Sequence, residues 1–166
     1  MMRFRFLSTL LLSLALLFHA QAAVAGTGQQ LIPFKGNDLK TGEPVDLARY
    51  IGEEPVLLVF WASWCPTCKH EVPKLNDLQA RYHNNGLRII GINVGMNDSR
   101  ARAKKWIDKQ KVTYPNIFDT KNTISRKYQV RGVPTVVIAD KNGTIRFKNF
   151  GVPGIDDNAI SQLNTP

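Results

Sequence analysis

An apolar run that leads almost directly into a pair of cysteines constrains this chain more than any other feature. The six residues Val56–Trp61 are all apolar and do not alternate with polar residues. Such a run predicts a strand buried on both faces, as in the centre of a sheet. The segment Cys65-Pro66-Thr67-Cys68 follows, and apolar residues then recur at a helical spacing, at Val72, Leu75, Leu78 and Tyr82. The sequence therefore predicts a strand, a turn that carries both cysteines, and a helix.

The rest of the chain is predicted to form short strands and helices around this unit. We expect a hairpin over 38–47 with its turn at Thr41-Gly42, strands over 87–94, 135–139 and 145–150, and a short extended piece over 114–118. Helices are expected after the cap Asn97-Asp98-Ser99, over 120–128, and from Asp156 onward. The first two long strands must be parallel, and the last hairpin adds antiparallel strands. The fold class is α/β, with a central mixed sheet flanked by helices.

The N-terminus has the organisation of a secretory signal. Arg3 and Arg5 precede an apolar run over 7–18, and Ala23-Val24-Ala25 forms a small-residue cleavage motif. The run is shorter than the roughly 20 residues that span a bilayer. We therefore predict a signal peptide over 1–25 and a single domain over 26–166 in a periplasmic or otherwise extracytoplasmic protein. An uncleaved N-terminal membrane anchor is the alternative.

The chain is basic, with a formal net charge of +9. The predicted export argues against a nucleic-acid partner, and the sequence contains no RNA-binding motif of aromatic and basic residues. The charge suits solubility, or contact with anionic membranes or acidic partners. The basic cluster within 100–111 is interpreted as a solvated helix face.

The two cysteines are the only ones in the sequence, and their spacing suits chemistry better than structural support. A loop this small removes little chain entropy, so a structural disulfide here would stabilise the fold poorly. If Cys65 caps the helix and Pro66 is its first residue, free backbone N–H groups and the helix dipole favour the Cys65 thiolate. Cys68 lies one turn on, within disulfide reach, and is expected to be the more buried sulfur. Cys65 would attack a substrate disulfide, and Cys68 would then resolve the mixed disulfide.

Residues near the pair allow several further interpretations. Glu71 is the nearest acidic residue, either as a base for Cys68 or as an ordinary helix glutamate. A c-type haem motif is excluded because Lys69 follows Cys68, with His70 one position late. A structural zinc site needs four ligands. It would have to use both cysteines, His70 and His83, which are all the cysteines and histidines outside the predicted signal segment. A copper site using both cysteines and a histidine is the remaining metal alternative; the prediction is that no metal or dissociable cofactor is bound.

Three stretches resemble the thioredoxin superfamily, and most of all its exported TlpA, ResA and CcmG (DsbE)-like thiol-disulfide oxidoreductases. They are F60-W-A-S-W-C-P-T-C-K-H-E-V-P73, I89-I-G-I-N-V-G95 and G132-V-P-T-V-V-I-A-D-K-N-G143. The resemblance implies a thioredoxin-like fold with an extra N-terminal hairpin over 38–47 and a helical insertion after Asn97. Pro66-Thr67 resembles the cytochrome c maturation member, whereas I-N-V-G resembles ResA.

The same resemblance implies roles for individual residues. Cys65 corresponds to the exposed nucleophile, Cys68 to the resolving thiol and Glu71 to a glutamate linked to proton transfer. Pro134 falls at the family's cis-proline, and Val133 where the backbone pairs with substrate. Trp64, Pro66 and Thr67 are expected to join Val133 and Pro134 in the substrate-binding surface.

Two departures from the family concern proton transfer and substrate choice. Val59 occupies the position of a buried aspartate in many thioredoxins, and Thr135 replaces the glutamate that follows the cis-proline in the cytochrome maturation branch. We expect a monomeric exported reductase that takes electrons from a membrane thiol donor and passes them to exported protein disulfides, apocytochrome c first among them. The alternatives are an oxidase or isomerase of the same fold, and a non-enzymatic copper chaperone or binding module.

Overall fold

The computed structural model describes residues 25–84 and 86–165. Its strands are β1 (Lys35–Asn37), β2 (Pro44–Asp46), β3 (Val56–Trp61), β4 (Arg88–Asn93), β5 (Asn116–Phe118), β6 (Thr135–Ala139) and β7 (Ile145–Phe150). Its helices are α1 (Pro66–Tyr82), α2 (Arg100–Lys109), α3 (Thr123–Lys127) and α4 (Asp157–Asn164), with a short 3-10 helix, η1, at Leu47–Arg49. The predicted signal segment lies outside the described residues except for Ala25, which is buried and donates its backbone N–H to the Lys127 carbonyl at 3.1 Å.

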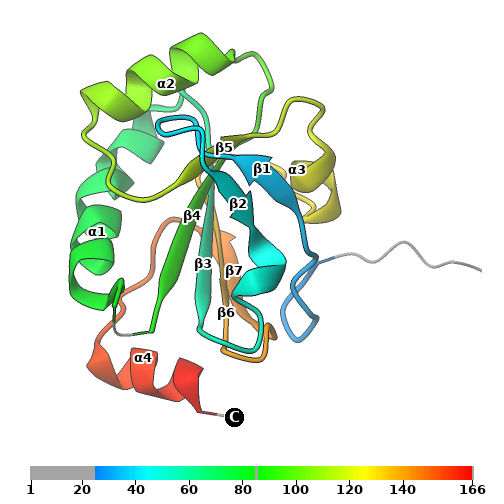
Figure 1. Cartoon of the computed structure of the whole chain (residues 1–166), viewed down its shortest axis with the longest axis vertical. Helices are drawn as coiled ribbons and strands as arrows, with labels where there is room; N and C mark the ends of the chain where they lie inside the picture. The colour runs from blue at the N-terminus through cyan, green and yellow to red at the C-terminus, as the bar shows by residue number, and fades with distance from the viewer. Residues whose placement is uncertain (1–24, 85, 166) are drawn as a thin grey trace, which may run out of the picture.

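Five strands form one mixed sheet in the order β5-β4-β3-β6-β7 (Figure 1). β4 pairs in parallel with both β3 and β5, whereas β6 is antiparallel to β3 and β7 is antiparallel to β6. All six residues of β3 are buried, because this strand is the middle one and helices or loops cover both of its faces. The predicted α/β class, the parallel first pair and the antiparallel final hairpin are confirmed.

The N-terminal hairpin is present but forms a separate two-stranded sheet, in which β1 and β2 are antiparallel. Its first strand precedes the predicted range 38–47, because Asp38 belongs to the turn. The Asp38 carboxylate accepts hydrogen bonds from the backbone N–H and the hydroxyl of Thr41, at 3.1 and 2.9 Å. Its other oxygen accepts the Asn116 N–H at 2.8 Å, which fastens the hairpin turn beside β5.

The helices occupy the two ends and the flanks of the sheet (Figure 1). α2 is the predicted helical insertion, and its Trp106 stacks on Trp61 at the end of β3, with 4.4 Å between ring centroids. α4 lies at the opposite end, where Asn164 donates to the Gly86 carbonyl. α3 is shorter than the predicted 120–128, because the Asp119 carboxylate binds the backbone N–H and the hydroxyl of Ser125 and sets the start of the helix. Among the helices in the described ranges, none is long and apolar enough to cross a bilayer.

Candidate active site

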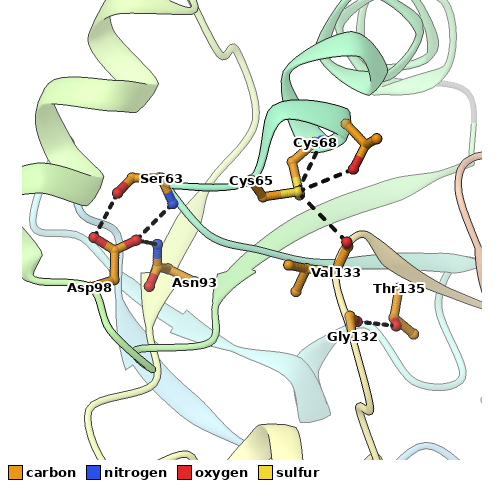
Figure 2. Close-up of a disulfide and its surroundings, with 9 residues drawn as sticks. Ser63, Cys65, Cys68, Asn93, Asp98, Gly132, Val133 and Thr135 are labelled. Carbon is orange, nitrogen blue, oxygen red and sulfur yellow. Dashed lines mark hydrogen bonds between the residues drawn. A yellow bond between two sulfur atoms is a disulfide. The ribbon is translucent and has the colours of Figure 1, made fainter.

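The two cysteines lie where β3 ends and α1 begins. Cys65 is the N-cap of α1 in extended conformation, Pro66 is the first helical residue, and the Cys65 sulfur accepts the Cys68 backbone N–H at 3.1 Å. Proline fits this position because its missing N–H would have had no partner within the helix. Cys65 and Cys68 are joined by a disulfide (Figure 2). The predicted N-cap geometry is therefore confirmed, and it places Cys65 at the positive end of the helix dipole.

The prediction that Cys68 is more buried than Cys65 is wrong for this oxidised state. Both residues are only 3% exposed, so Cys65 is no more accessible than Cys68. Crowding around the Cys65 sulfur explains its low exposure: the Thr67 hydroxyl lies 3.4 Å away and the Val133 carbonyl oxygen 3.6 Å away. Because a disulfide sulfur carries no proton, the contact with Val133 is a van der Waals contact in this state.

The loop before β6 brings Val133 to the disulfide (Figure 2). The Val133–Pro134 peptide bond is cis, as the resemblance implies, and Pro134 is buried. The hydroxyl of Thr135 donates to the Gly132 carbonyl at 2.7 Å and closes the loop. Since β6 pairs with β3, this loop emerges beside the end of β3, where the cysteines lie.

Glu71 lies one helical turn after Cys68, but its polar contacts lead elsewhere. Its carboxylate accepts the Val152 backbone N–H at 3.1 Å and lies 3.9 Å from the ammonium group of Lys74. The side chain is 19% exposed and joins α1 to the segment that follows β7. None of the contacts described for this side chain reaches a sulfur atom, so its role as a base stays a prediction.

A fully buried carboxylate, which the sequence indicated only as part of a helix cap, holds the turn before Cys65. The Asp98 side chain is 0% exposed. One of its oxygens accepts the Ser63 backbone N–H at 2.7 Å and the Asn93 side-chain amide at 2.8 Å. The other oxygen accepts the Ser63 hydroxyl at 2.7 Å (Figure 2). It also accepts the Ser99 backbone N–H at 2.8 Å. Nothing in the spacing of the sequence could link Asp98 to Ser63, 35 positions earlier; only the parallel pairing of β3 with β4 brings them together.

The stability that Asp98 contributes is expected to depend on pH. Burial by itself would raise the pKa of this carboxyl, but the hydrogen bonds from Asn93, Ser63 and Ser99 outweigh burial and hold the pKa below 3.8. A lowered native pKa stabilises the fold above about pH 4, and this stabilisation is lost as the pH falls through the native pKa. Asp98→Asn should therefore lower the free energy of unfolding by about 1–3 kcal/mol at pH 7 and by clearly less at pH 3. Urea unfolding at both pH values measures the difference; an equal loss at both would contradict a lowered pKa.

A cavity of about 300 Å³ lies between Trp64, the residue before Cys65, and the loop that carries Val133; neither cysteine lines it. Trp64, Val94, Met96, Val130 and Val133 give it a mainly apolar lining, and Arg126 and Arg131 add positive charge. Two of the predicted substrate-binding residues, Trp64 and Val133, therefore line one cavity. Trp64 directly precedes Cys65, and the Val133 carbonyl oxygen lies 3.6 Å from the Cys65 sulfur. The others lie apart from it: Pro66 and Thr67 are exposed on the first turn of α1, and Pro134 is buried under the loop.

The histidines considered as metal ligands, His70 and His83, are both exposed on or just after α1. Within residues 25–84 and 86–165, no group of three or more histidine, cysteine, aspartate or glutamate side chains is placed to hold a metal ion.

Comparison with protein families and curated proteins relates this geometry to known proteins. Residues 27–148 match the AhpC/TSA family. The thiol-disulfide oxidoreductase ResA of Geobacillus kaustophilus is 30% identical over 129 residues, which cover 78% of this chain and 72% of ResA. The thiol:disulfide interchange protein DsbE of Vibrio cholerae is 34% identical over 126 residues, which cover 75% of this chain and 65% of DsbE.

Solved structures with the same fold include proteins that are more than 25% identical to this chain. A DsbE-type thiol:disulfide interchange protein from Chlorobium tepidum superposes with a TM-score of 0.70 at 28% identity, over 83% of this chain and 94% of its own. A secreted disulfide oxidoreductase of Mycobacterium tuberculosis superposes with a TM-score of 0.62 at 27% identity, over 78% of this chain and 92% of its own.

Proposed function

Because this chain belongs to the AhpC/TSA family and is a thiol-disulfide oxidoreductase of the ResA and DsbE type, we propose that it is exported and reduces disulfides in other extracytoplasmic proteins. The observation that carries this proposal is the Cys65–Cys68 disulfide at the N-terminus of α1, with the Val133 carbonyl 3.6 Å from the Cys65 sulfur. The helix N-terminus favours a thiolate at Cys65, and the Val133 loop offers backbone to an extended substrate segment. The signal-like segment over 1–25 supports export, as does the likeness to a secreted oxidoreductase.

The reaction needs only the two cysteines and two electrons. In the reduced protein the Cys65 thiolate attacks one sulfur of a substrate disulfide, a mixed disulfide forms, and the other substrate sulfur leaves as a thiolate that takes a proton. The Cys68 sulfur, once deprotonated, attacks the Cys65 sulfur, which forms the Cys65–Cys68 disulfide and releases the second substrate thiol. A membrane thiol donor then returns two electrons and two protons to the pair. No dissociable cofactor takes part in these steps.

We propose apocytochrome c as the first candidate substrate, with its haem-binding cysteines reduced before haem attachment. Support comes from Pro66-Thr67, which resembles the cytochrome c maturation branch, and from the DsbE relatives. Because Thr135 stands where that branch has a glutamate, we expect the contact with substrate at this position to differ from the contact in that branch. Its hydroxyl is engaged with the Gly132 carbonyl, and it carries no charge to present to a substrate.

Trapping of the mixed disulfide tests the proposal. Cys68→Ser removes the resolving thiol, so disulfide-linked complexes with exported proteins should accumulate through Cys65 in intact cells. Mass spectrometry of these complexes names the substrate, and Cys65→Ser/Cys68→Ser is the matched control that should trap nothing. Equal complex formation in the double variant, or trapping of cytoplasmic proteins alone, would contradict the proposal.

The direction of electron flow is tested by the reduction potential of the Cys65–Cys68 pair. Reductases of this chemistry have potentials of about −270 mV and strong oxidants of about −120 mV. Equilibration with glutathione buffers, read out by alkylation of the free thiols, measures the potential. A value near the oxidant end would favour the oxidase or isomerase alternative.

Glu71→Gln tests the proposed role of Glu71 as the base for Cys68. Glutamine keeps an oxygen that accepts the Val152 N–H, so the contact between α1 and the segment after β7 survives while the carboxylate is lost. We expect the resolving step at pH 7 to slow by about 10²-fold, with recovery at higher pH where Cys68 ionises unaided. Stopped-flow measurement of the mixed-disulfide decay across pH values gives the rate. The exposed Glu53, changed to glutamine, is the control, and an unchanged pH profile for Glu71→Gln would refute the role.

A further inference from the structure

Two chain segments are fastened together at two points on the Trp64 side of the disulfide. The buried Asp98 carboxylate binds both the backbone N–H and the hydroxyl of Ser63, each at 2.7 Å. One residue further on, the Trp64 indole N–H donates to the Met96 carbonyl at 2.9 Å. The two residues that precede Cys65 are therefore held against the segment 93–99, which runs from the end of β4 to the start of α2.

These attachments orient one wall of the cavity that Trp64 and Val133 line. Trp64 and Met96 are 48% and 55% exposed, unusually high fractions for such large apolar side chains, and both line the cavity. We call this pair the Trp64–Met96 wall. The hydrogen bond from the Trp64 indole to the Met96 carbonyl holds this side chain against the segment 93–99, so the position of the Ser63–Trp64 turn sets where the ring lies. Across the cavity lies Val133, whose carbonyl oxygen is 3.6 Å from the Cys65 sulfur.

We propose that Asp98 is a positioning residue for substrate binding: it fixes the Ser63–Trp64 turn so that the Trp64–Met96 wall receives a large apolar side chain next to the attacked substrate cysteine. This inference rests on the function proposed above, and it adds the chemical class of the substrate segment. A cavity of about 300 Å³ is at the small end of ligand sites, which suits one or two side chains better than a free cofactor. Its apolar lining selects an aromatic or branched aliphatic residue.

The hydrogen bonds of Asp98 explain why a carboxylate is needed. Four hydrogen-bond donors reach it, two to each oxygen: the backbone N–H and the hydroxyl of Ser63, the amide of Asn93 and the backbone N–H of Ser99. The Arg102 guanidinium adds an ion pair at 3.6 Å. An asparagine at this position has one acceptor oxygen, and its NH₂ group would face a backbone N–H in either orientation. Asp98→Asn should therefore loosen the turn in part, and Asp98→Ala should release it.

The experiment compares two peptides that differ at one residue. Each contains a Cys-x-x-Cys disulfide, and the residue next to the first cysteine is phenylalanine in one peptide and alanine in the other. For the wild-type protein we expect kcat/KM to favour the phenylalanine peptide by about tenfold or more. In Asp98→Ala this preference should fall to about twofold or less, through a higher KM for the phenylalanine peptide with little change in kcat. Asp98→Asn should lie between the two.

Two further variants separate positioning from a general loss of stability. Asp140 is a second buried carboxylate that accepts a backbone N–H, from Thr144, and a side-chain donor, from Arg146. It follows β6 at the end of the sheet remote from the cysteines, because Ala139 pairs with Val56 where β3 begins. Asp140→Ala should destabilise the protein but keep the peptide preference. Met96→Ala alters the wall at an exposed position and should lose the preference even if Asp98→Ala does not fold.

The results of these assays distinguish failure of the proposed function from failure of the positioning role of Asp98. Failure of the wild-type protein to reduce either peptide would overturn the proposed reductase function itself. Reduction of both peptides with an unchanged preference in Asp98→Asn and Met96→Ala would overturn only the positioning role. A fall in oxidised-glutathione reduction equal to the fall for the phenylalanine peptide would also overturn it, because Asp98 would then act on Cys65 rather than on the cavity.

Discussion

Replacing Cys65 with serine is expected to lower the rate of protein-disulfide reduction by about 10³-fold or more, because the serine hydroxyl stays protonated at neutral pH and cannot replace a thiolate. The fold should survive, since serine is itself a good N-cap and its oxygen can accept the Cys68 N–H that the sulfur accepts now. The residual rate should equal that of the uncatalysed exchange. Reduction of a disulfide-bonded protein substrate, followed by labelling of its released thiols, measures the effect.

This experiment also decides which cysteine attacks, a choice that exposure does not make. Both cysteines are 3% exposed in the disulfide form, so the assignment depends on the N-cap position of Cys65. The unpaired N–H groups and the dipole at a helix N-terminus lower the pKa of a thiol there, which favours the thiolate in the reduced protein. Full reductase activity in Cys65→Ser, with activity lost in Cys68→Ser, would reverse the assignment. The matched pair of serine variants therefore serves as its own control.

Gly91→Ala is expected to cause a large loss of stability. Gly91 lies in β4 and pairs with Asn116 of β5, whose side-chain oxygen accepts the Trp61 indole N–H at 2.8 Å. A Cβ atom on Gly91 would overlap that oxygen and lie 3.2 Å from the indole nitrogen. Overpacking and the loss of a buried hydrogen bond together should cost about 3–5 kcal/mol. Since the free energy of unfolding of a typical domain is about 5–15 kcal/mol, the variant should be marginally stable.

Urea unfolding followed by tryptophan fluorescence measures the loss, and two comparisons make it specific. Gly154→Ala adds a methyl group into open space at a glycine without positive φ, so its effect should stay within about 0.5 kcal/mol. Asn116→Ala removes the obstructing oxygen, so adding Gly91→Ala to that background should cost much less than in the wild-type protein. Additive losses in the double variant would show that Gly91 does not make room for the Trp61–Asn116 hydrogen bond.

Local sequence patterns predicted the elements that depend on neighbouring residues. The unbroken apolar run of β3, the proline at the first position of α1 and the Asn97-Asp98-Ser99 segment each imposed a structure through contacts a few residues apart. Boundaries shifted where a side-chain hydrogen bond outweighed the local pattern, over 78 positions in one case and six in the other. Asp38 became a turn residue because it binds Asn116, and α3 shortened because Asp119 binds Ser125. The cis Val133–Pro134 bond was implied by family resemblance rather than by any pattern in the residues.

The sequence by itself determined the redox unit, because an N-capping cysteine, a proline and a second cysteine three positions on act within one helical turn. Only the tertiary structure decided what surrounds that unit. The Val133 carbonyl meets Cys65 across 68 positions, Asp98 meets Ser63 across 35, and Trp61 meets Asn116 across 55. These contacts follow from strand order and register in the central sheet, which depend on how all five strands pack together. Such long-range contacts leave no local pattern in the sequence.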